Sequence, residues 1–150
     1  MPERGLELTF ELDVARPPGD VFALLVDPDH FRLLDPAVLD YGPKIALSID
    51  SEGWFKHRRG GMTARTTYRV TAFDPPRRLE VAISGMGYAM TEGAELDSIP
   101  MGTRARFVDR VWPTTLPGRL LIALSGGFMR RDLEARAARL KALLEARPRG

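Results

Sequence analysis

The sequence predicts an α+β fold in which an antiparallel sheet is closed by a long C-terminal helix. Residues 6–14 alternate apolar and polar side chains with the period of a half-buried strand. Short strand-like runs separated by turn residues follow one another between residues 54 and 112, with the spacing of an antiparallel meander. Residues 116–146 then carry leucines and alanines at helical spacing. Together these patterns indicate a sheet whose apolar face is covered by the last helix.

Two short helices are expected directly after the first strand. The sequence Pro-Pro-Gly at residues 17–19 breaks the strand, and an apolar helix over residues 21–26 follows until a proline ends it. A second short helix is expected over residues 29–34. Prolines and a glycine between residues 36 and 43 prevent a longer helix, so the second strand is predicted at residues 45–49.

Five further strands complete a predicted sheet of seven. Residues that favour turns, such as Asp, Pro and Gly, separate the strands from one another. No spacing typical of an α/β crossover occurs between them, which favours an antiparallel sheet. The five strands are expected at residues 54–59, 64–73, 79–84, 88–96 and 103–112.

The closing helix is expected over residues 116–146. Pro117 lies in its first turn, where a missing amide hydrogen costs little. Gly126 and Gly127 cost about 2 kcal/mol relative to two alanines, so a kink or a break is expected at this pair. Apolar residues recur at helical spacing in the second half: Leu133, Ala137, Leu140 and Leu144.

Length and composition limit the possible classes of protein. A chain of 150 residues fits a single domain over residues 1–150, which buries roughly 70% of the surface that the unfolded chain exposes. The absence of cysteine excludes thiol nucleophiles and thiolate metal sites. Four acidic residues among the first thirteen do not fit a secretory signal, and no apolar run approaches the roughly 20 residues that span a bilayer. We therefore expect a cytoplasmic protein without an integral membrane span.

Charge and histidine content argue against two kinds of partner. The net charge is only +2, and the basic residues are interleaved with acidic ones over most of the chain, which is typical of a solvated surface. We therefore expect no nucleic-acid partner. His30 and His57 are the only histidines and do not indicate a metal site, and no cofactor is expected. A homodimer through an edge strand or the last helix remains open.

Three segments, spread over nearly the whole chain, carry a resemblance to a known family. Residues 14–28 (VARPPGDVFALLVDP) look like its opening strand, helix and Asp-Pro step, residues 73–79 (FDPPRRL) like a central hairpin, and residues 102–107 (GTRARF) like the start of its last strand. On these segments the chain resembles the START and polyketide cyclase-like (SRPBCC) superfamily, which includes the birch pollen allergen. The resemblance implies the helix-grip fold, in which a curved antiparallel sheet wraps around a long C-terminal helix. It also implies a hydrophobic ligand pocket between the two.

Four polar side chains are candidates for catalysis in such a pocket. If the strands alternate without bulges, Glu92, Asp109, Tyr68 and His57 point to the interior, and Tyr68 shares its face with Ala72. A carboxylate enclosed without a cation has a raised pKa and suits proton transfer to or from an enolisable substrate. An alternative remains open for each kind of residue. The carboxylates of Glu92 and Asp109 can instead pair on the surface with cross-strand arginines. His57, which has basic neighbours, can instead belong to an exposed strand end.

Seven apolar or aromatic positions are candidates for the pocket lining. Methionine is flexible and suits irregular apolar ligands, but each of these side chains also fits a solid core, and only a cavity distinguishes the two. The positions are Phe55, Tyr88, Met90, Phe107, Leu124, Phe128 and Met129.

Three functions are consistent with these patterns. The leading hypothesis is a carrier or sensor that encloses a small hydrophobic ligand, such as a lipid, an isoprenoid quinone or an aromatic or polyketide metabolite. The alternative is an enzyme of the polyketide cyclase or dehydratase type, since members of the superfamily differ in activity and a fold does not settle function. The third is a protein-interaction module with a filled core.

Overall fold

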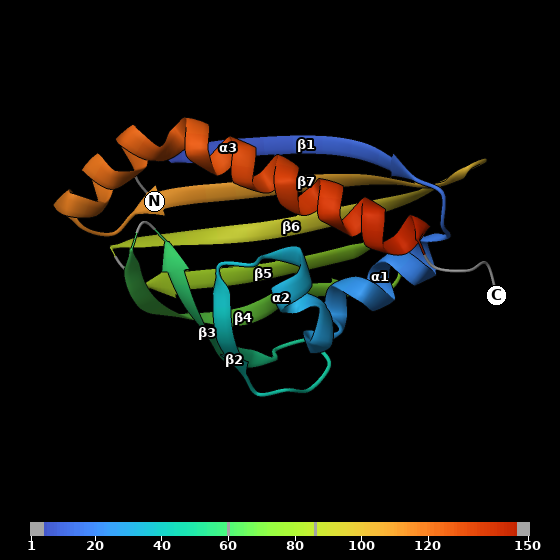
Figure 1. The fold of residues 1–150 in the computed structure, drawn as a ribbon, viewed down its shortest axis with the longest axis horizontal. Coiled ribbons are helices and arrows are strands. Elements are labelled where there is room, and N and C mark those ends of the chain that lie inside the picture. The colour runs from blue at the N-terminus through green and yellow to red at the C-terminus, as the bar shows by residue number, and fades with distance from the viewer. Residues whose placement is uncertain (1–4, 60, 86, 147–150) are drawn as a thin grey trace.

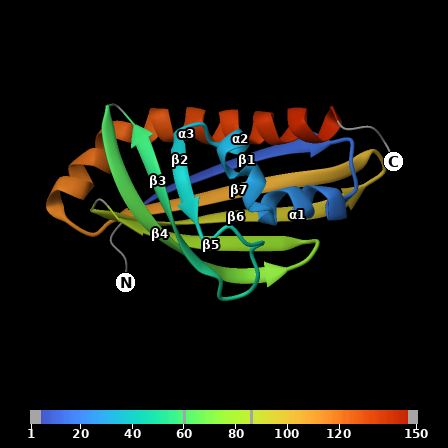
Figure 2. The same cartoon turned by 60° about the horizontal axis from the view of Figure 1, so that its bottom comes forward.

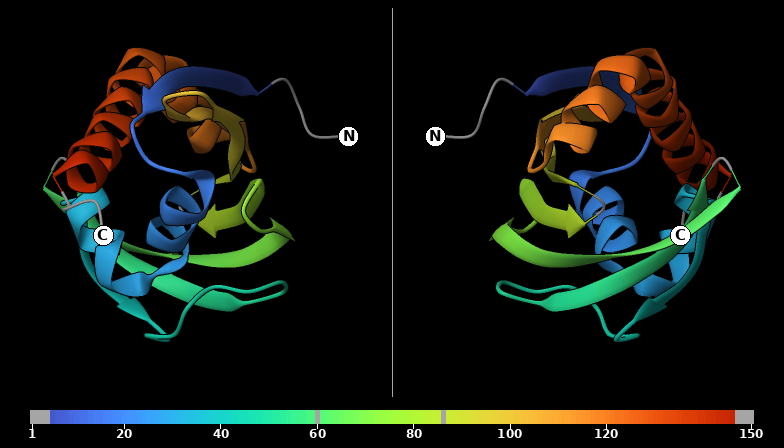
Figure 3. Two further views of the ribbon diagram at one scale, coloured as in Figure 1. Left: turned by 90° about the vertical axis from the view of Figure 1, so that its right-hand side faces the viewer. Right: turned by 90° about the vertical axis from the view of Figure 1, so that its left-hand side faces the viewer.

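One curved sheet of seven antiparallel strands forms the frame of the molecule (Figure 1). The structure is a computed structural model that describes residues 5–59, 61–85 and 87–146. The strand order is β1-β7-β6-β5-β4-β3-β2, so the first strand pairs with the last. Viewed from its ends in Figure 3, the sheet curves around the helices on its concave side. The strands are β1 Leu6–Val14, β2 Val38–Gly42, β3 Glu52–Arg59, β4 Met62–Asp74, β5 Arg78–Gly85, β6 Tyr88–Ile99 and β7 Gly102–Pro113.

The helices cover the concave face of the sheet. α1 (Pro18–Val26), a 3-10 turn (Pro28–His30) and α2 (Phe31–Leu34) follow β1, and α3 (Leu116–Glu145) ends the fold. α3 packs against β1 and β7, while α2 packs against α3 from the other side. The predicted helix-grip architecture, with a seven-stranded antiparallel sheet and two short helices after the first strand, is confirmed. Within the described part of the chain, none of these helices has the length and apolar character required to span a membrane.

The second strand lies earlier in the chain than predicted. β2 covers Val38–Gly42 and pairs with β3, so that Tyr41 stands opposite Phe55. A register shift between Val38 and Asp40 interrupts the alternation, which hides the strand from a search for period two. The prediction of a strand at residues 45–49 is wrong, because only Leu47 of that segment is buried and its amide donates to the carbonyl of Val26 at 3.0 Å.

A bulge reverses the inward face of β4. The register with β5 shifts between Val70 and Ala72, which inserts one extra residue into β4. Tyr68 and Val70 are buried before the bulge, and beyond it Phe73 turns inward and meets Phe22 edge to face, with ring centroids 5.4 Å apart. The prediction that Ala72 shares the face of Tyr68 is therefore wrong.

α3 is continuous across the glycine pair but not straight. The residues 116–145 form one helix, so no break occurs at Gly126 and Gly127. Figure 2 shows that the first part of the helix, in orange, runs in a different direction from the second part, in red. Gly126 lies against the side chain of Leu6, where an added Cβ would be 3.7 Å from a methyl carbon. The expected kink or break is therefore a bend within one continuous helix.

The solid core and the hollow part of the molecule lie side by side. Val14, Val21, Leu24, Leu140 and Leu144 are at most 1% exposed and pack α1 and the end of α3 on the sheet. Each such side chain contributes about 1.5–3 kcal/mol when it is removed from water. This core anchors the second half of α3 on the sheet. The helix therefore stays packed even though the space between α2, α3 and β3–β7 is not filled by side chains.

Candidate functional site

A cavity of about 220 Å³ lies between the concave face of the sheet and the helices α2 and α3. An engineered protein cavity of about 150 Å³ accepts benzene, while pockets for drug-sized ligands measure about 300–1,000 Å³. The space therefore matches a molecule of one or two rings. An interior that is filled throughout, as the interaction-module hypothesis requires, is not what the structure shows.

Aromatic and aliphatic side chains make most of the wall. Phe55 from β3, Tyr88 and Met90 from β6 and Phe107 from β7 are part of it, as predicted from strand alternation. Phe55 also stacks at a tilt on Tyr68, with ring centroids 4.9 Å apart. Wide aromatic faces give the cavity a shape that suits flat, apolar molecules.

Three predicted lining residues lie outside the wall. Leu124 is 78% exposed and Phe128 is 54% exposed, and both belong to the first half of α3. Met129 is half-buried but does not line the cavity. The bend in α3 is the reason, since only the second half of the helix faces the hollow, through Leu133 and Ala137. The prediction that these three residues line the pocket is wrong.

The four polar candidates all line this one cavity. Asp109 is 4% exposed, Tyr68 5% and His57 7%. Glu92 is partly buried and stands directly opposite Asp109 in the pairing of β6 with β7. His57 is buried and lines the cavity together with Phe55, so the alternative of an exposed basic strand end is wrong. The alternative of surface pairing is wrong for Asp109 as well, since its carboxylate is enclosed.

An arginine from α3 binds both carboxylates. Arg136 donates from Nη2 to Oδ2 of Asp109 at 3.0 Å and from Nη1 to Oε1 of Glu92 at 3.1 Å. Its Nε lies 3.2 Å from Oδ2 of Asp132, one helical turn earlier. The planar guanidinium presents its donors in a fixed fork, which suits several carboxylates around one centre. Both carboxylates are therefore paired with a cation, Arg136, whereas the sequence-based prediction considers a carboxylate enclosed without one.

A signal for Arg136 was present in the sequence. The residue stands three positions after Leu133 and four before Leu140, within the apolar stripe that faces the sheet. A long cationic side chain in such a stripe requires an acidic partner on the facing element. The sequence-based prediction pairs the carboxylates with arginines of neighbouring strands, whereas their cation comes from the helix.

Burial raises the pKa of the Asp109 carboxyl group to about 7. The negative charge of Glu92 acts in the same direction, and the ion pair with Arg136 opposes both. Burial lowers the pKa of the Arg136 guanidinium, but the surrounding carboxylates outweigh this effect and raise it, so Arg136 stays a cation. Burial also raises the pKa of the Tyr68 phenol. Near neutral pH, Asp109 therefore exchanges a proton inside a largely apolar cavity, while Tyr68 remains a hydrogen-bond donor.

The polar end of the cavity carries more carboxyl groups than cations. Glu92, Asp109 and Asp35 line the space together with a single arginine, and Asp132 contacts that arginine from outside the wall. Within the described residues, no group of three or more His, Asp or Glu is arranged to hold a metal ion. The surplus of carboxyl groups favours a ligand that is neutral or donates hydrogen bonds over one that is anionic.

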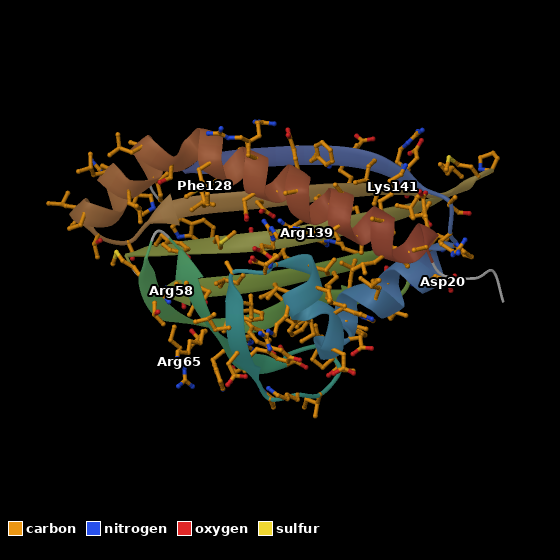
Figure 4. The ribbon with its side chains drawn as sticks, in the orientation of Figure 1. Asp20, Arg58, Arg65, Phe128, Arg139 and Lys141 are labelled. Carbon is orange, nitrogen blue, oxygen red and sulfur yellow. The ribbon has the colours of Figure 1, made fainter. Side chains whose placement is uncertain are left out.

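A second arginine of α3, which does not line the cavity, joins this helix to α2. Arg139 donates from Nη1 to the carbonyl oxygen of Leu34 at 3.0 Å, and Figure 4 shows its side chain between the two helices. Leu34 and Phe31 form the α2 part of the lining. A hydrogen bond thus joins the short helix, which contributes to the lining, to the long helix.

Comparisons with known proteins agree with this architecture. A family model described as polyketide cyclase / dehydrase and lipid transport matches residues 6–145. Among solved structures, TTHA0849 from Thermus thermophilus has a TM-score of 0.76 at 17% identity and covers 94% of this chain and 98% of its own. The allergen Ara h 8.0201 has a TM-score of 0.74 at 12% identity and covers 96% of this chain and 100% of its own.

One similar structure carries a stated enzymatic role. The di-domain aromatase/cyclase StfQ of the steffimycin biosynthetic pathway has a TM-score of 0.76 at 12% identity, covering 94% of this chain and 51% of its own. At such identities the likeness shows the fold alone. No curated protein matches the sequence.

Proposed function

Because the chain belongs to the polyketide cyclase / dehydrase and lipid transport family, we propose that it binds a small, uncharged aromatic or alicyclic molecule in the cavity under α3, as a carrier or sensor. The observation that carries this proposal is the cavity itself, with its apolar wall and its one polar end. The description of the family covers both lipid-like and polyketide-like ligands. The volume of this cavity favours some of these ligands over others.

The size of the cavity supports a ligand of one or two rings. A volume of about 220 Å³ lies below the range of about 300–1,000 Å³ that is usual for drug-sized ligands, which favours a ligand smaller than a whole lipid or an isoprenoid quinone. Removing about 200 Å² of apolar ligand surface from water contributes about 5 kcal/mol, before the cost of ordering the ligand. We therefore expect dissociation constants of roughly micromolar to millimolar order.

The polar groups support a neutral ligand with a hydroxyl or carbonyl group. Protonated Asp109 donates a hydrogen bond and ionised Asp109 accepts one, so it pairs with either kind of group. Arg136 is held by Glu92, Asp109 and Asp132, and a ligand carboxylate would have to compete with these partners for it. An anion is thereby disfavoured.

The direct test is to titrate the protein with 2-naphthol and to fill the cavity in a variant. Ala137→Leu adds volume to the α3 wall, and Ala82→Leu adds the same side chain at a β5 position whose neighbours Val81 and Ile83 face the cavity instead. We expect 2-naphthol to bind the native protein and Ala82→Leu alike, and to bind Ala137→Leu at least about tenfold more weakly. Equal binding by all three proteins would rule out the cavity as the site.

An enzyme of the cyclase or dehydratase type is the second candidate, favoured by the pKa of Asp109 near 7 beside the cavity. In such a reaction the Asp109 carboxylate removes a proton next to a ligand carbonyl, and the Tyr68 phenol donates a hydrogen bond to the resulting enolate oxygen. Exchange of the α-protons of 2-tetralone in D₂O, followed by NMR, tests this role. Exchange that is faster than in buffer, rises with pH through about 7 and disappears in Asp109→Asn supports the enzyme. Exchange that is no faster than in buffer rules out this enzymatic role, and the carrier or sensor function then stands alone.

A further inference from the structure

The first half of α3 exposes its apolar side chains to solvent. Leu116 is 77% exposed, Leu120 62%, Leu124 78% and Phe128 54%. These positions recur every four residues, so they form one stripe along the helix. A surface helix of a soluble domain normally turns such a stripe toward the core, as the second half of α3 does with Leu133 and its successors. A contiguous apolar face of this kind marks an interaction surface.

The segment of the chain that carries this stripe has charged residues of one sign only. Between Asp109 and Asp132 the sequence contains no acidic residue, whereas acidic and basic residues alternate over most of the remaining chain. Arg119, Arg130 and Arg131 belong to the same segment, and all three are exposed. Arginine beside exposed leucine and phenylalanine is the composition of helices that lie in the headgroup region of membranes.

The hairpin of β3 and β4 contributes further exposed apolar and cationic side chains at the same end of the molecule. Figures 1 and 2 place the first part of α3 and the connected ends of β3 and β4 at one end of the fold, away from the turn between β4 and β5. Met62, the first residue of β4, is 65% exposed. Arg58 is also exposed, and Figure 4 shows it at this end together with Phe128. The apolar and cationic side chains thus gather at one end from two separate elements.

We propose that this end of the molecule docks on a membrane surface rich in anionic lipids. The exposed stripe of α3 inserts among the acyl chains close to the headgroups, and Arg119, Arg130 and Arg131 contact the lipid phosphates. The helix lies in the plane of the surface. Docking in this way places the cavity, which the second half of the same helix covers, next to the bilayer. The proposal does not depend on which ligand the cavity binds.

Flotation with lipid vesicles tests the apolar part of the surface. The native protein is expected to float with vesicles of phosphatidylcholine and phosphatidylglycerol and to stay unbound with phosphatidylcholine alone. The double variant Leu120→Ser/Leu124→Ser should lower the bound fraction at least about tenfold. The matched control Ile45→Ser/Ile49→Ser replaces two side chains that are 62% and 54% exposed on a different loop, and it should bind as the native protein does.

The cationic part is tested by charge and by salt. Arg130→Gln/Arg131→Gln should weaken binding and reduce its dependence on salt, while Arg77→Gln/Arg78→Gln, at the turn between β4 and β5, should change neither. Circular dichroism checks that all four variants remain folded. Absence of vesicle binding, or binding that Leu120→Ser/Leu124→Ser leaves unchanged, overturns the proposal. A dimer in solution that the same double variant dissociates also overturns it, because a second copy then covers the stripe.

Discussion

Arg136 of α3 donates to Asp109 of β7 at 3.0 Å, and this ion pair connects the closing helix to the sheet across the edge of the cavity. The second donor of the guanidinium binds Glu92 on the adjacent strand. Asp109 is 4% exposed, so the pair is shielded from solvent on the strand side. One side chain of the helix therefore determines both where α3 lies on the sheet and what charge the cavity contains.

Replacement of Arg136 is expected to destabilise the protein strongly. Arg136→Met leaves Asp109 and Glu92 without their cation, and breaking a buried pair in this way costs about 3–5 kcal/mol of unfolding free energy. Part of the loss should be recovered at acidic pH, where the remaining carboxylates take up protons. Urea unfolding at neutral and acidic pH measures both effects.

The matched control is Arg110→Met. Arg110 pairs with Glu7 on the outside of the sheet, and the two side chains are 54% and 56% exposed. Such a surface pair contributes about 0–1 kcal/mol. Equal losses in Arg136→Met and Arg110→Met would contradict the importance of the enclosed pair.

Asp109 should make the stability of the protein depend on pH. Its folded pKa of about 7 lies above the ordinary value of 3.8, so the folded protein binds this proton more tightly than the unfolded chain. The contribution to stability is complete below about pH 4 and is lost as pH rises toward and through about 7. Asp109→Asn lacks this titration. The unfolding free energy of the variant, relative to the native protein, should therefore increase between about pH 5 and about pH 8. A difference that stays constant with pH would contradict the assignment.

Gly53 of β3 should tolerate no side chain, because atoms of β2 and β4 lie close to it on either side. A Cβ at this position would overlap the carbonyl oxygen of Gly42 on β2 and the ring of Tyr68 on β4. Gly53→Ala is therefore expected to cost about 1–3 kcal/mol, since the backbone or the cavity wall has to move. Thermal unfolding checks the loss.

Gly19→Ala is the control for that substitution. Its added Cβ meets nothing within 4 Å, and the residue lies in the first turn of α1. Alanine there should leave the stability unchanged or raise it by about 0.5–1 kcal/mol. If Gly53→Ala is as stable as Gly19→Ala, the close packing of β2 on β3 and β4 is wrong.

Most of the fold could be predicted because its signals are local. The alternation of residues 6–14 defines β1 with the same bounds that the structure shows, and the leucines of the second half of α3 define its buried face. β2 was misplaced because a register shift at Val38 and Asp40 removes the alternation that identifies a strand. The bulge at Val70 and Ala72 misdirected one position of β4 for the same reason. Both irregularities depend on pairing with distant strands, which a local pattern does not contain.

Part of the cavity lining can be predicted from the sequence. Strand alternation was enough to direct Asp109, Glu92, His57 and Tyr68 toward one cavity, since each lies in a regular stretch of its strand. It was not enough for α3, where the bend decides which half of the helix faces the sheet. Leu124 and Phe128 were placed in the wall, and Arg136 was missed, because the orientation of a helix on a sheet depends on contacts between segments far apart in the sequence.

The charge of the preferred ligand tests the proposed binding site as a whole. Calorimetric titration at neutral pH compares 2-naphthol, which is neutral, with 2-naphthoate, which has the same two rings and an anionic carboxylate. We expect 2-naphthol to bind at least about tenfold more tightly, because the carboxyl groups of Asp109, Glu92 and Asp35 outnumber the one arginine in the cavity wall. Equal or tighter binding of 2-naphthoate would contradict the proposed site, because Arg136 would then serve the ligand instead of the sheet.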